Sequence, residues 1–318
     1  MKARKLLPLL LVSILTTSCS TDYSDRIFAF DTYININIAS KTQDVVGTVK
    51  DVIKRFDILS DNYLERTENN VYTINHTSES IEIDEVLGDL LMVTQHVSNE
   101  GAKYFSMFTG SLSKKWKESL AKGEVLSNEV IQEELEKINN TSLTISLDKK
   151  HVQKTGEAEI DLGGIVKGYM LDYVKVYLET VNNLRYYLIN AGASSILLGE
   201  KKTDNGYYTV GLNDIPNSYI KLKNCFFSAS GNLEQGVTIG DVTYSHIVNP
   251  FTGSTLTQYD TVRVVTETGY LGDALSTSLM LSSLEEIKKV EKDLGIQVIV
   301  SKDNQIVYKS DSLEVYTR

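Results

Sequence analysis

Residues 237–248 read VTIGDVTYSHIV, and this stretch decides the fold class. Gly240 and Asp241 stand between two runs rich in β-branched residues, a pattern typical of two strands joined by a tight turn. Residues 142–153 and 296–309 repeat the pattern. Strands that follow one another directly as hairpins, without intervening helices, favour an α+β fold over a doubly wound parallel sheet.

The rest of the chain fits the same class. Apolar residues at helical spacing predict helices over residues 45–59, 84–99, 105–119, 127–139, 168–181 and 273–281. Alternating or β-rich runs predict single strands over residues 28–38, 186–198, 207–212 and 260–266. No proline- or glycine-rich linker divides the chain. We therefore expect one large domain over residues 27–318, with mixed, mostly antiparallel sheets and flanking helices.

The first residues have the features of an export signal. The basic MKARK precedes LLPLLLVSILTT, an apolar run too short for a permanent membrane span, and then Ser18 and Cys19. A small residue before a cysteine resembles a bacterial lipoprotein processing site. This predicts a signal peptide over residues 1–18, a lipidated tether over residues 19–26, and a membrane-anchored lipoprotein on the outer side of the cell membrane. The alternative is an ordinary secretory signal in which Cys19 is incidental.

Charge and cysteine content exclude several classes of function. Removal of residues 1–18 takes away three basic residues and no acidic one, which lowers the formal net charge from −10 to −13. Such a surface repels nucleic acid and anionic lipid, so we expect no nucleic-acid partner and a membrane tether made by the lipid alone. Cys225 would be the remaining thiol, which excludes a disulfide framework and a cysteine metal site.

Residues 160–172, IDLGGIVKGYMLD, carry a candidate ligand site. They predict a strand end, a two-glycine turn and the start of a helix, where free N–H groups and the helix dipole suit a phosphate. Asp161 can anchor the turn or accept a ligand hydrogen bond, and Lys167 adds a cation. Neither standard nucleotide-binding glycine pattern is present. The alternative reading is a turn whose glycines only satisfy its geometry.

Residues 272–279, GDALSTSL, carry a candidate metal site. Asp273 and Thr277 are four residues apart on a predicted helix and therefore lie on one face. A carboxylate, a hydroxyl and nearby backbone carbonyls provide the hard oxygen ligands that suit Mg²⁺. The alternative is that Asp273 is the N-cap of the helix, with Thr277 packed below it.

Residues 244–253, YSHIVNPFTG, place His246 at a predicted strand end before a tight turn. Pro250 fixes φ in that turn, and Gly253 is free to take a positive φ. Histidine and proline are both scarce in the chain, with 4 and 3 residues respectively. A rigid turn beside a histidine suits an aimed imidazole, although a histidine that only packs at a strand end has the same pattern.

Five ordered segments together resemble one family, the ApbE-type FAD:protein FMN transferases. They are IDLGGIVKGYMLD, INAGASSILLGE, SASGN, YSHIVNPFTG and GDALSTSL, and the resemblance runs from FDTY near residue 30 to about residue 300. It implies an α+β fold and a reaction in which FAD, with Mg²⁺ bound, donates FMN to a threonine hydroxyl of a target protein and releases AMP. The acceptor motif in this family resembles Asp-x-x-Thr.

The resemblance also implies roles for individual residues. Asp273, Thr277 and the backbone carbonyl of Gly164 would bind the metal, and His246 with Asp273 would be catalytic. Positions implied to contact FAD are Phe30, Asn62 and Tyr63 at the flavin, Tyr104, Phe105 and Ser106 at the adenine and ribose, and Asp161, Lys167, His246 and Ile247. Ser106, Asn249 and Ala193 depart from the residues usual in the family, which leaves individual FAD contacts open.

His246 then has a chemical role, because a threonine hydroxyl that attacks a pyrophosphate must lose its proton, and a histidine with a pKa near neutral accepts protons well. Two other functions stay open. One is a Mg²⁺-dependent FAD pyrophosphatase in which water replaces threonine. The other is a non-enzymatic flavin-binding lipoprotein. No aspartate of this chain has a threonine three residues later, which disfavours a protein that carries covalent flavin itself.

Overall fold

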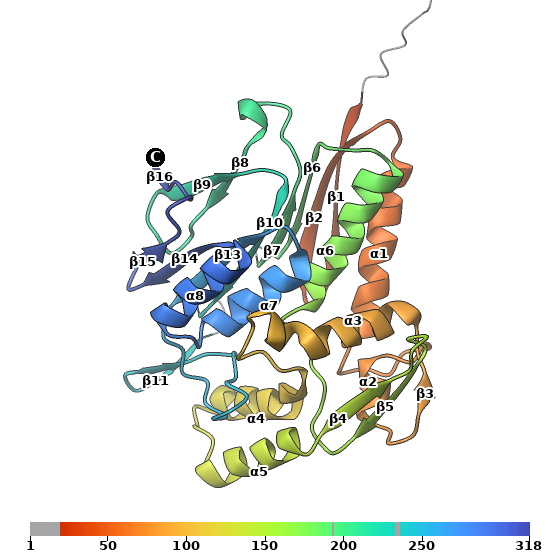
Figure 1. The fold of residues 1–318 in the computed structure, drawn as a ribbon, viewed down its shortest axis with the longest axis vertical. Helices are drawn as coiled ribbons and strands as arrows, with labels where there is room; N and C mark the ends of the chain where they lie inside the picture. Colours follow the sequence, from red (N-terminus) through yellow and green to blue (C-terminus); the bar gives the residue numbers. More distant parts are fainter. Residues whose placement is uncertain (1–19, 193, 233–235) are drawn as a thin grey trace, which may run out of the picture.

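A computed structural model describes residues 20–192, 194–232 and 236–318 (Figure 1). Its largest element is an eight-stranded sheet in the order β1-β2-β6-β7-β10-β13-β14-β15, with all neighbouring strands antiparallel. The strands are β1 (Thr21–Ala29), β2 (Thr32–Ser40), β6 (Tyr187–Ala191), β7 (Ser195–Leu198), β10 (Cys225–Gly231), β13 (Thr261–Thr266), β14 (Gln297–Lys302) and β15 (Gln305–Lys309). The predicted α+β class is confirmed.

The helices α1 (Asp44–Ser60), α6 (Val166–Val176), α7 (Gly269–Leu279) and α8 (Leu284–Leu294) cover one face of this sheet (Figure 1). The helices α2 (Val71–Asn75), α3 (Glu85–His96), α4 (Gly110–Ala121) and α5 (Asn128–Asn139) lie toward its lower end in Figure 1. Short helical turns, at Val97–Glu100, Met107–Thr109, Tyr177–Val181 and Asp204–Gly206, complete the set. Helices α1, α3, α6 and α7 contribute apolar side chains to one large core with the sheet, such as Phe56, Leu90, Met170 and Leu275.

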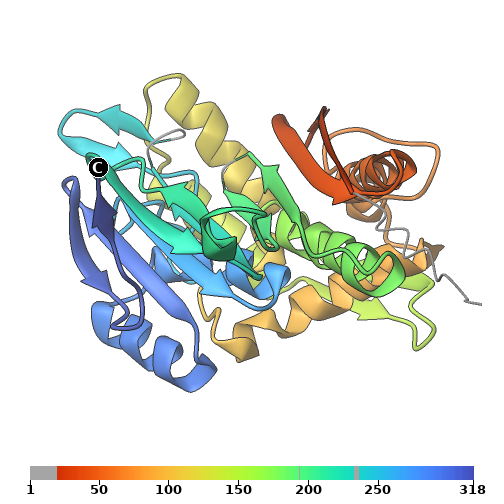
Figure 2. The same cartoon turned by 90° about the horizontal axis from the view of Figure 1, so that it is seen from above.

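Three smaller sheets surround the central one. The sheet β16-β9-β8, with β8 (Tyr208–Gly211), β9 (Ser218–Leu222) and β16 (Tyr316–Thr317), shares a second core with the large sheet. The sheet β3-β5-β4, with β3 (Ile81–Glu82), β4 (Ser142–Ile145) and β5 (His151–Thr155), lies beside α2. The hairpin of β11 (Val237–Ile239) and β12 (Val242–Tyr244) packs against the core formed by α4 and α5. Figure 2 places the β1–β2 hairpin and α1 at one end of the molecule and β14, β15 and α8 at the other.

Two predicted single strands are hairpins instead. The alternation over residues 28–38 continues through a turn at Phe30 and Asp31, whose φ angles are 52° and 55°. A bulky aromatic residue at positive φ is uncommon, so a phenylalanine at this position does not indicate a turn. The predicted strand over residues 186–198 is likewise split into β6 and β7, and Gly192 takes a φ of 70° at the turn. Ala193 lies outside the described residues.

One strand boundary also differs from the prediction. Strand β1 begins at Thr21, earlier than predicted, and pairs with β2 from its first residue, so residues 21–26 of the predicted tether lie in the sheet. The predicted signal peptide and Cys19 lie outside the described residues and stay predictions. Among the described helices, none is long and apolar enough to cross a membrane.

Candidate active site

The carboxylate of Asp273 occupies the centre of the candidate site. The residue lies in the second turn of α7 and is 5% exposed. Its Oδ1 accepts hydrogen bonds from Ser195 Oγ (2.8 Å) and Ser228 Oγ (2.6 Å). Its Oδ2 accepts one from the Gly168 N–H (2.7 Å). The N-cap of α7 is Thr268, so the reading of Asp273 as the N-cap is wrong.

This buried carboxylate makes no ion pair with any described residue. Burial raises the pKa of Asp273, and the positive charge of Lys167 and the hydrogen bonds from Ser228 and Ser195 oppose the shift. A buried carboxylate that lacks a paired cation is costly, and a bound cation would stabilise its charged form. The serine hydroxyls fix the orientation of the carboxylate, as outer partners of metal ligands commonly do.

Oxygen atoms suited to a hard cation lie next to Asp273. Thr277 follows one helical turn later and is half-buried, with its Oγ1 3.3 Å from Ser230 Oγ. Gly164 faces Thr277 from the turn before α6. A Cβ added to Gly164 would lie 3.3 Å from Thr277 Oγ1 and 2.9 Å from a ring carbon of Phe105, so glycine permits this approach. The carboxylate and the hydroxyl thus come from α7, and the backbone carbonyl comes from the turn before α6.

This donor set has one carboxylate. Among the described residues no group of three or more His, Cys, Asp or Glu side chains could hold a metal ion. The predicted set of Gly164, Asp273 and Thr277 does not need such a group, because hydroxyl and carbonyl oxygens complete it. Hard oxygen ligands of this kind fit Mg²⁺, whose remaining positions are commonly filled by water and substrate phosphates.

His246 lies in the loop that follows β12, not at the end of a strand as predicted. Strand β12 ends at Tyr244 because the chain then turns, with the Ser245 N–H donating to the Thr255 carbonyl (2.9 Å). The His246 side chain is exposed to solvent, and its ring makes no hydrogen bond to any described residue. A free, accessible ring nitrogen is what proton transfer to a ligand requires.

The turn after His246 is firmly held. The Asn249 side chain accepts the N–H groups of Phe251 (2.9 Å) and Thr252 (3.2 Å). The Gly253 N–H donates to the Asn249 carbonyl (2.8 Å), and Trp116 Nε1 donates to the Gly253 carbonyl (2.8 Å). Asn249 therefore performs the turn-forming role that an aspartate would, so this departure from the family pattern keeps the geometry.

Ile247 is 5% exposed and packs into the main core beside His246, with its N–H donating to Ser245 Oγ (3.1 Å). A buried side chain of this kind fixes the backbone on one side of the histidine. The surrounding protein and the positive charge of Lys167 both lower the pKa of His246. The imidazole is therefore neutral, and able to accept a proton, at neutral pH.

Lys167 connects the two halves of the site. Its charge acts on both Asp273 and His246, which places the three side chains in one neighbourhood. The side chain is half-buried and makes no ion pair with a described residue. A cation without a protein partner at the first turn of α6 suits an anionic ligand such as a phosphate.

Asp161 shapes the glycine turn of this segment. Its N–H donates to the Met107 carbonyl (2.8 Å), and its Oδ1 accepts the Gly163 N–H (2.7 Å). The α6 N-cap is Ile165, which makes no capping hydrogen bond through its side chain. Asp161 therefore anchors the turn, one of the two roles that the sequence left open, and its second carboxylate oxygen stays available.

A second group of predicted residues lies beside this turn. The negative charges of Asp161 and Asp31 both act on Tyr63, so the residue 61–64 loop, the β1–β2 turn and the glycine turn lie close together. Tyr63 is 54% exposed, with Lys114 Nζ 4.8 Å from the centre of its ring. Lys114 also donates to the Asn62 carbonyl (3.2 Å) and pairs with Glu159.

Asn62 is 6% exposed, whereas Phe30 is half-buried in the β1–β2 turn and donates its N–H to Asp57 Oδ1 (2.6 Å). Burial raises the pKa of the Asp57 carboxyl group, and the negative charge of Asp61 acts on it in the same direction. The fold therefore brings together Phe30, Asn62 and Tyr63, the three residues that the family resemblance assigns to the flavin.

The segment of residues 104–106 lies on the α7 side. The Tyr104 N–H donates to Ser278 Oγ (2.9 Å), and the Tyr104 ring meets the Phe251 ring edge-on at 5.8 Å. Phe105 is 8% exposed and packs against Gly164. Ser106 Oγ accepts the Phe108 N–H (3.2 Å) and so caps a helical turn, which gives this serine a local structural role.

Sequence reasoning missed Ser195 and Ser228 as partners of Asp273. Both lie in segments that the resemblance quoted, but nothing in the sequence says that they face one carboxylate. In the structure they are directly opposite on β7 and β10, so their side chains leave the sheet on the same side, beneath α7. The two serines could be recognised as partners only from the pairing of β7 with β10, and that pairing requires the register between the two strands.

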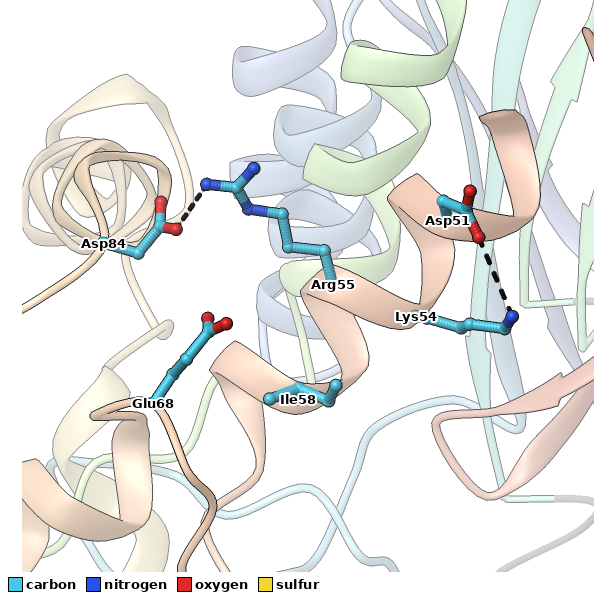
Figure 3. Close-up of a pocket in the computed structure, with 6 residues that line it drawn as sticks. All are labelled: Asp51, Lys54, Arg55, Ile58, Glu68 and Asp84. Atoms are coloured by element: carbon cyan, nitrogen blue, oxygen red, sulfur yellow. Dashed lines mark hydrogen bonds and ion pairs between the residues drawn. The ribbon is translucent and has the colours of Figure 1, made fainter. Parts of the chain in front are cut away.

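The structure also has a surface pocket elsewhere, drawn in Figure 3. This cavity of about 380 Å³ is lined by Asp51, Lys54, Arg55, Ile58, Glu68 and Asp84. Its charges pair with one another, as in Arg55 with Asp84 and Lys54 with Asp51. No residue predicted for the candidate site lines it, so its position does not favour a role in the same chemistry.

Comparison with known proteins decides the family. The family model described as the ApbE family matches residues 30–300 of the 318. The chain belongs to the ApbE family. The match covers most of the chain, and the membership predicted from the five ordered segments is confirmed.

Relatives of this ApbE-family chain share low sequence identity. It is 25% identical to the FAD:protein FMN transferase of Klebsiella pneumoniae, over 87% of this chain and 88% of that protein. It is 24% identical to the FAD:protein FMN transferase of Treponema pallidum, over 66% of this chain and 63% of that protein. The match to the Rhodobacter capsulatus protein, at 25% identity, spans 45% of this chain and only 28% of that protein.

Solved structures show the same fold. The ApbE protein from Thermotoga maritima aligns with a TM-score of 0.78 at 23% identity, over 92% of this chain and 98% of that one. The flavinyl transferase ApbE from Pseudomonas stutzeri aligns with a TM-score of 0.76 at 18% identity, over 92% of this chain and 96% of that one. The predicted architecture of a single domain with flanking helices is therefore confirmed.

Proposed function

We propose that this chain is an FAD:protein FMN transferase, the activity named for its relatives in Klebsiella pneumoniae and Treponema pallidum. The observation that carries the proposal is the convergence of three chemical elements in one place. A partner-free imidazole at His246, an unpaired cation at Lys167 and the oxygen set around Asp273 come from segments far apart in the sequence.

The reaction that these residues support is an in-line displacement at phosphorus. A threonine hydroxyl oxygen of the acceptor protein forms a bond to the phosphorus of the FMN half of FAD, and the bond from that phosphorus to the bridging oxygen breaks. AMP leaves with the bridging oxygen. His246 accepts the hydroxyl proton, for a typical rate gain of about 10²–10⁴-fold. Lys167 binds the pyrophosphate oxygens.

We further propose that Gly164, Asp273 and Thr277 hold Mg²⁺, through a carbonyl, a carboxylate and a hydroxyl oxygen. The buried, unpaired carboxylate of Asp273 supports this assignment, because a cation would offset its charge. When bound, the metal would neutralise the pyrophosphate oxygens and help to orient the attack. The hydrogen bonds from Ser195 and Ser228 would keep the Asp273 carboxylate in the orientation that binds the metal.

FAD itself would extend to both sides of this centre. On the flavin side, the cluster of Phe30, Asn62, Tyr63 and Asp161 would contact the isoalloxazine and ribityl part. On the other side, Tyr104, Phe105 and Ser106 would lie along the adenine and ribose, with Ile247 supporting the wall near His246. Aromatic side chains with polar neighbours are the usual lining of such sites.

The acceptor would be a protein segment with an Asp-x-x-Thr motif. The exposure of His246 supports an acceptor that approaches from solvent. The lipoprotein signal predicted over residues 1–18 supports an exported enzyme held to the membrane by a lipid on Cys19, and so a partner in the same compartment. The acidic composition supports no role for nucleic acid.

The exposure of His246 to solvent also favours a second candidate function, the hydrolysis of FAD by water. Incubation of the protein with FAD, Mg²⁺ and an acceptor containing Asp-x-x-Thr separates the two. We expect the intact mass of the acceptor to increase by one FMN less one water, with one AMP released per modified acceptor, and an acceptor with Thr→Ala to stay unmodified. Free FMN and AMP with an unmodified acceptor would establish a pyrophosphatase, and bound but intact FAD would establish a binding protein.

A further inference from the structure

Helices α6 and α7 carry the same five-residue pattern near their N-termini. Residues 168–172 read GYMLD and residues 269–273 read GYLGD, so each has glycine and tyrosine followed by aspartate at the fifth position. The two helices lie side by side over the sheet in Figure 1. The candidate site uses the second aspartate, and nothing described so far uses the first.

The equivalent residues of the two patterns contact each other. A Cβ on Gly168 would lie 2.1 Å from the Gly269 carbonyl oxygen, and a Cβ on Gly269 would lie 2.2 Å from the Gly168 carbonyl oxygen. The rings of Tyr169 and Tyr270 meet edge-on, with centres 6.3 Å apart. The helices therefore cross backbone to backbone, and only glycine fits at this crossing.

Each aspartate accepts hydrogen bonds from the N-terminal turn of the other helix. Asp273 Oδ2 accepts the Gly168 N–H at 2.7 Å. Asp172 Oδ1 accepts the Gly269 N–H at 2.7 Å, and its Oδ2 accepts the Tyr270 N–H at 2.9 Å. Neither helix is capped by the side chain of its own N-cap residue, so these carboxylates serve as the caps.

The two aspartates differ in what else surrounds them. Asp273 also accepts hydrogen bonds from the hydroxyl groups of Ser195 and Ser228. Asp172 has hydrogen bonds only to the α7 backbone among the described residues, and Lys175 is the cation whose charge acts on it. Asp172 therefore binds the first turn of α7 and makes no hydrogen bond to the proposed oxygen ligands, while the negative charge of Asp273 acts on it.

We propose that Asp172 is a positioning residue that sets the register between α6 and α7 and thereby the spacing of the metal-binding oxygens. Gly164 lies two residues before the first residue of α6, whereas Asp273 and Thr277 lie on α7. Their separation depends on how α7 is held against α6, and Asp172 holds its first turn. This inference rests on the proposed metal site.

The test compares Asp172→Asn with Asp84→Asn. Asp84 is a matched control, because it also caps a helix through a backbone N–H (Val86, 2.8 Å) and lies in the separate pocket of Figure 3. FAD affinity is measured by flavin fluorescence as Mg²⁺ is increased. We expect Asp172→Asn to raise the half-saturating Mg²⁺ concentration about tenfold, the lower end of the effect of outer metal partners.

Two further readouts separate positioning from general destabilisation. In chelator, Asp172→Asn should bind FAD as wild type does, and its kcat for transfer should recover at excess Mg²⁺. Asp84→Asn should show the wild-type Mg²⁺ dependence even if its melting temperature falls equally. Asp172→Ser keeps one acceptor oxygen and should shift the Mg²⁺ dependence in the same direction by less, which provides a second variant if the first folds poorly.

An unchanged Mg²⁺ dependence in the folded Asp172 variants would overturn the inference and leave the proposed function intact. Equal shifts in Asp172→Asn and Asp84→Asn would also overturn it, because the effect would then follow stability. A wild-type protein whose FAD affinity ignores Mg²⁺ would overturn the metal site itself, and this inference with it.

Discussion

Substitution of Gly168 by alanine tests the crossing of α6 and α7 most severely. The new Cβ would lie 2.1 Å from the Gly269 carbonyl oxygen, 2.5 Å from its carbonyl carbon and 2.9 Å from Asp273 Cγ. Ordinary contacts between such atoms begin at about 3.4 Å, so the helices must separate by more than about 1 Å. The two nearest atoms belong to the Gly269 backbone, and the Asp273 side chain is held by its hydrogen bonds, so neither can move easily to absorb the clash.

The expected cost follows from two opposing effects. Overpacking typically costs about 1–3 kcal/mol, and the clash with backbone atoms puts this site near the upper end. Alanine regains about 1 kcal/mol of helix propensity relative to glycine. The net loss in the free energy of unfolding is therefore about 2 kcal/mol, or a decrease of roughly 4 °C in melting temperature for a chain of this size.

Thermal unfolding and the Mg²⁺ dependence of FAD binding measure the two consequences. Gly47→Ala is the matched control, because Gly47 is also inside a helix but a Cβ there would have nothing within 4 Å. It should raise stability by about 0.5–1 kcal/mol and leave Mg²⁺ dependence unchanged. A Gly168→Ala protein as stable as wild type, with unchanged Mg²⁺ dependence, would refute the close crossing.

Four other substitutions test three separate parts of the account. Lys167→Ala should weaken binding of FAD much more than of riboflavin, which lacks phosphates; equal weakening in fluorescence titrations would place Lys167 away from the phosphates. Asp273→Ala should lower the transfer rate more than Thr277→Ala, and added Mg²⁺ should partly rescue only the threonine variant, since a neutral ligand contributes less; full activity of Asp273→Ala in chelator would exclude the site. Cys19→Ala should release the protein from membranes on fractionation, and unchanged retention would exclude the lipid anchor.

Most elements of the fold were predictable because their patterns are local. Helix α1 keeps Val49, Ile53 and Phe56 on one buried face at a spacing of three to four residues, which is the signal that the sequence carried. The hairpin at residues 237–244 followed from the Gly-Asp turn. The β1–β2 turn was missed because apolar alternation runs through Phe30, whose positive φ is held by a hydrogen bond to Asp57, 27 residues away.

The candidate site was predictable as a set of positions but not as a set of contacts. Asp273 and Thr277 are neighbours on one helix, so their spacing was visible in the sequence. Ser195 and Ser228 become partners of Asp273 only through strand register, and Asp172 only through the helix crossing. The two Gly-Tyr-x-x-Asp patterns are too short to indicate pairing until the structure brings them together.

The most direct measurement of the central claim is the single-turnover rate of FMN transfer at saturating FAD, followed against pH. Surrounding protein and Lys167 lower the pKa of His246 below its ordinary value near 6.5, so the neutral base is lost only in acid. The account predicts a rate that rises with pH through an apparent pKa below about 6.5 and is level at neutral pH.

His246→Ala should bind FAD within a few-fold of wild type, lose about 10²–10⁴-fold in rate, and lose the rising limb in acid. His246→Asn should do no better, because an amide nitrogen cannot accept the proton. A His246→Ala protein that keeps the wild-type pH profile, or that loses FAD affinity and rate together, would contradict the assignment of His246 as the proton acceptor.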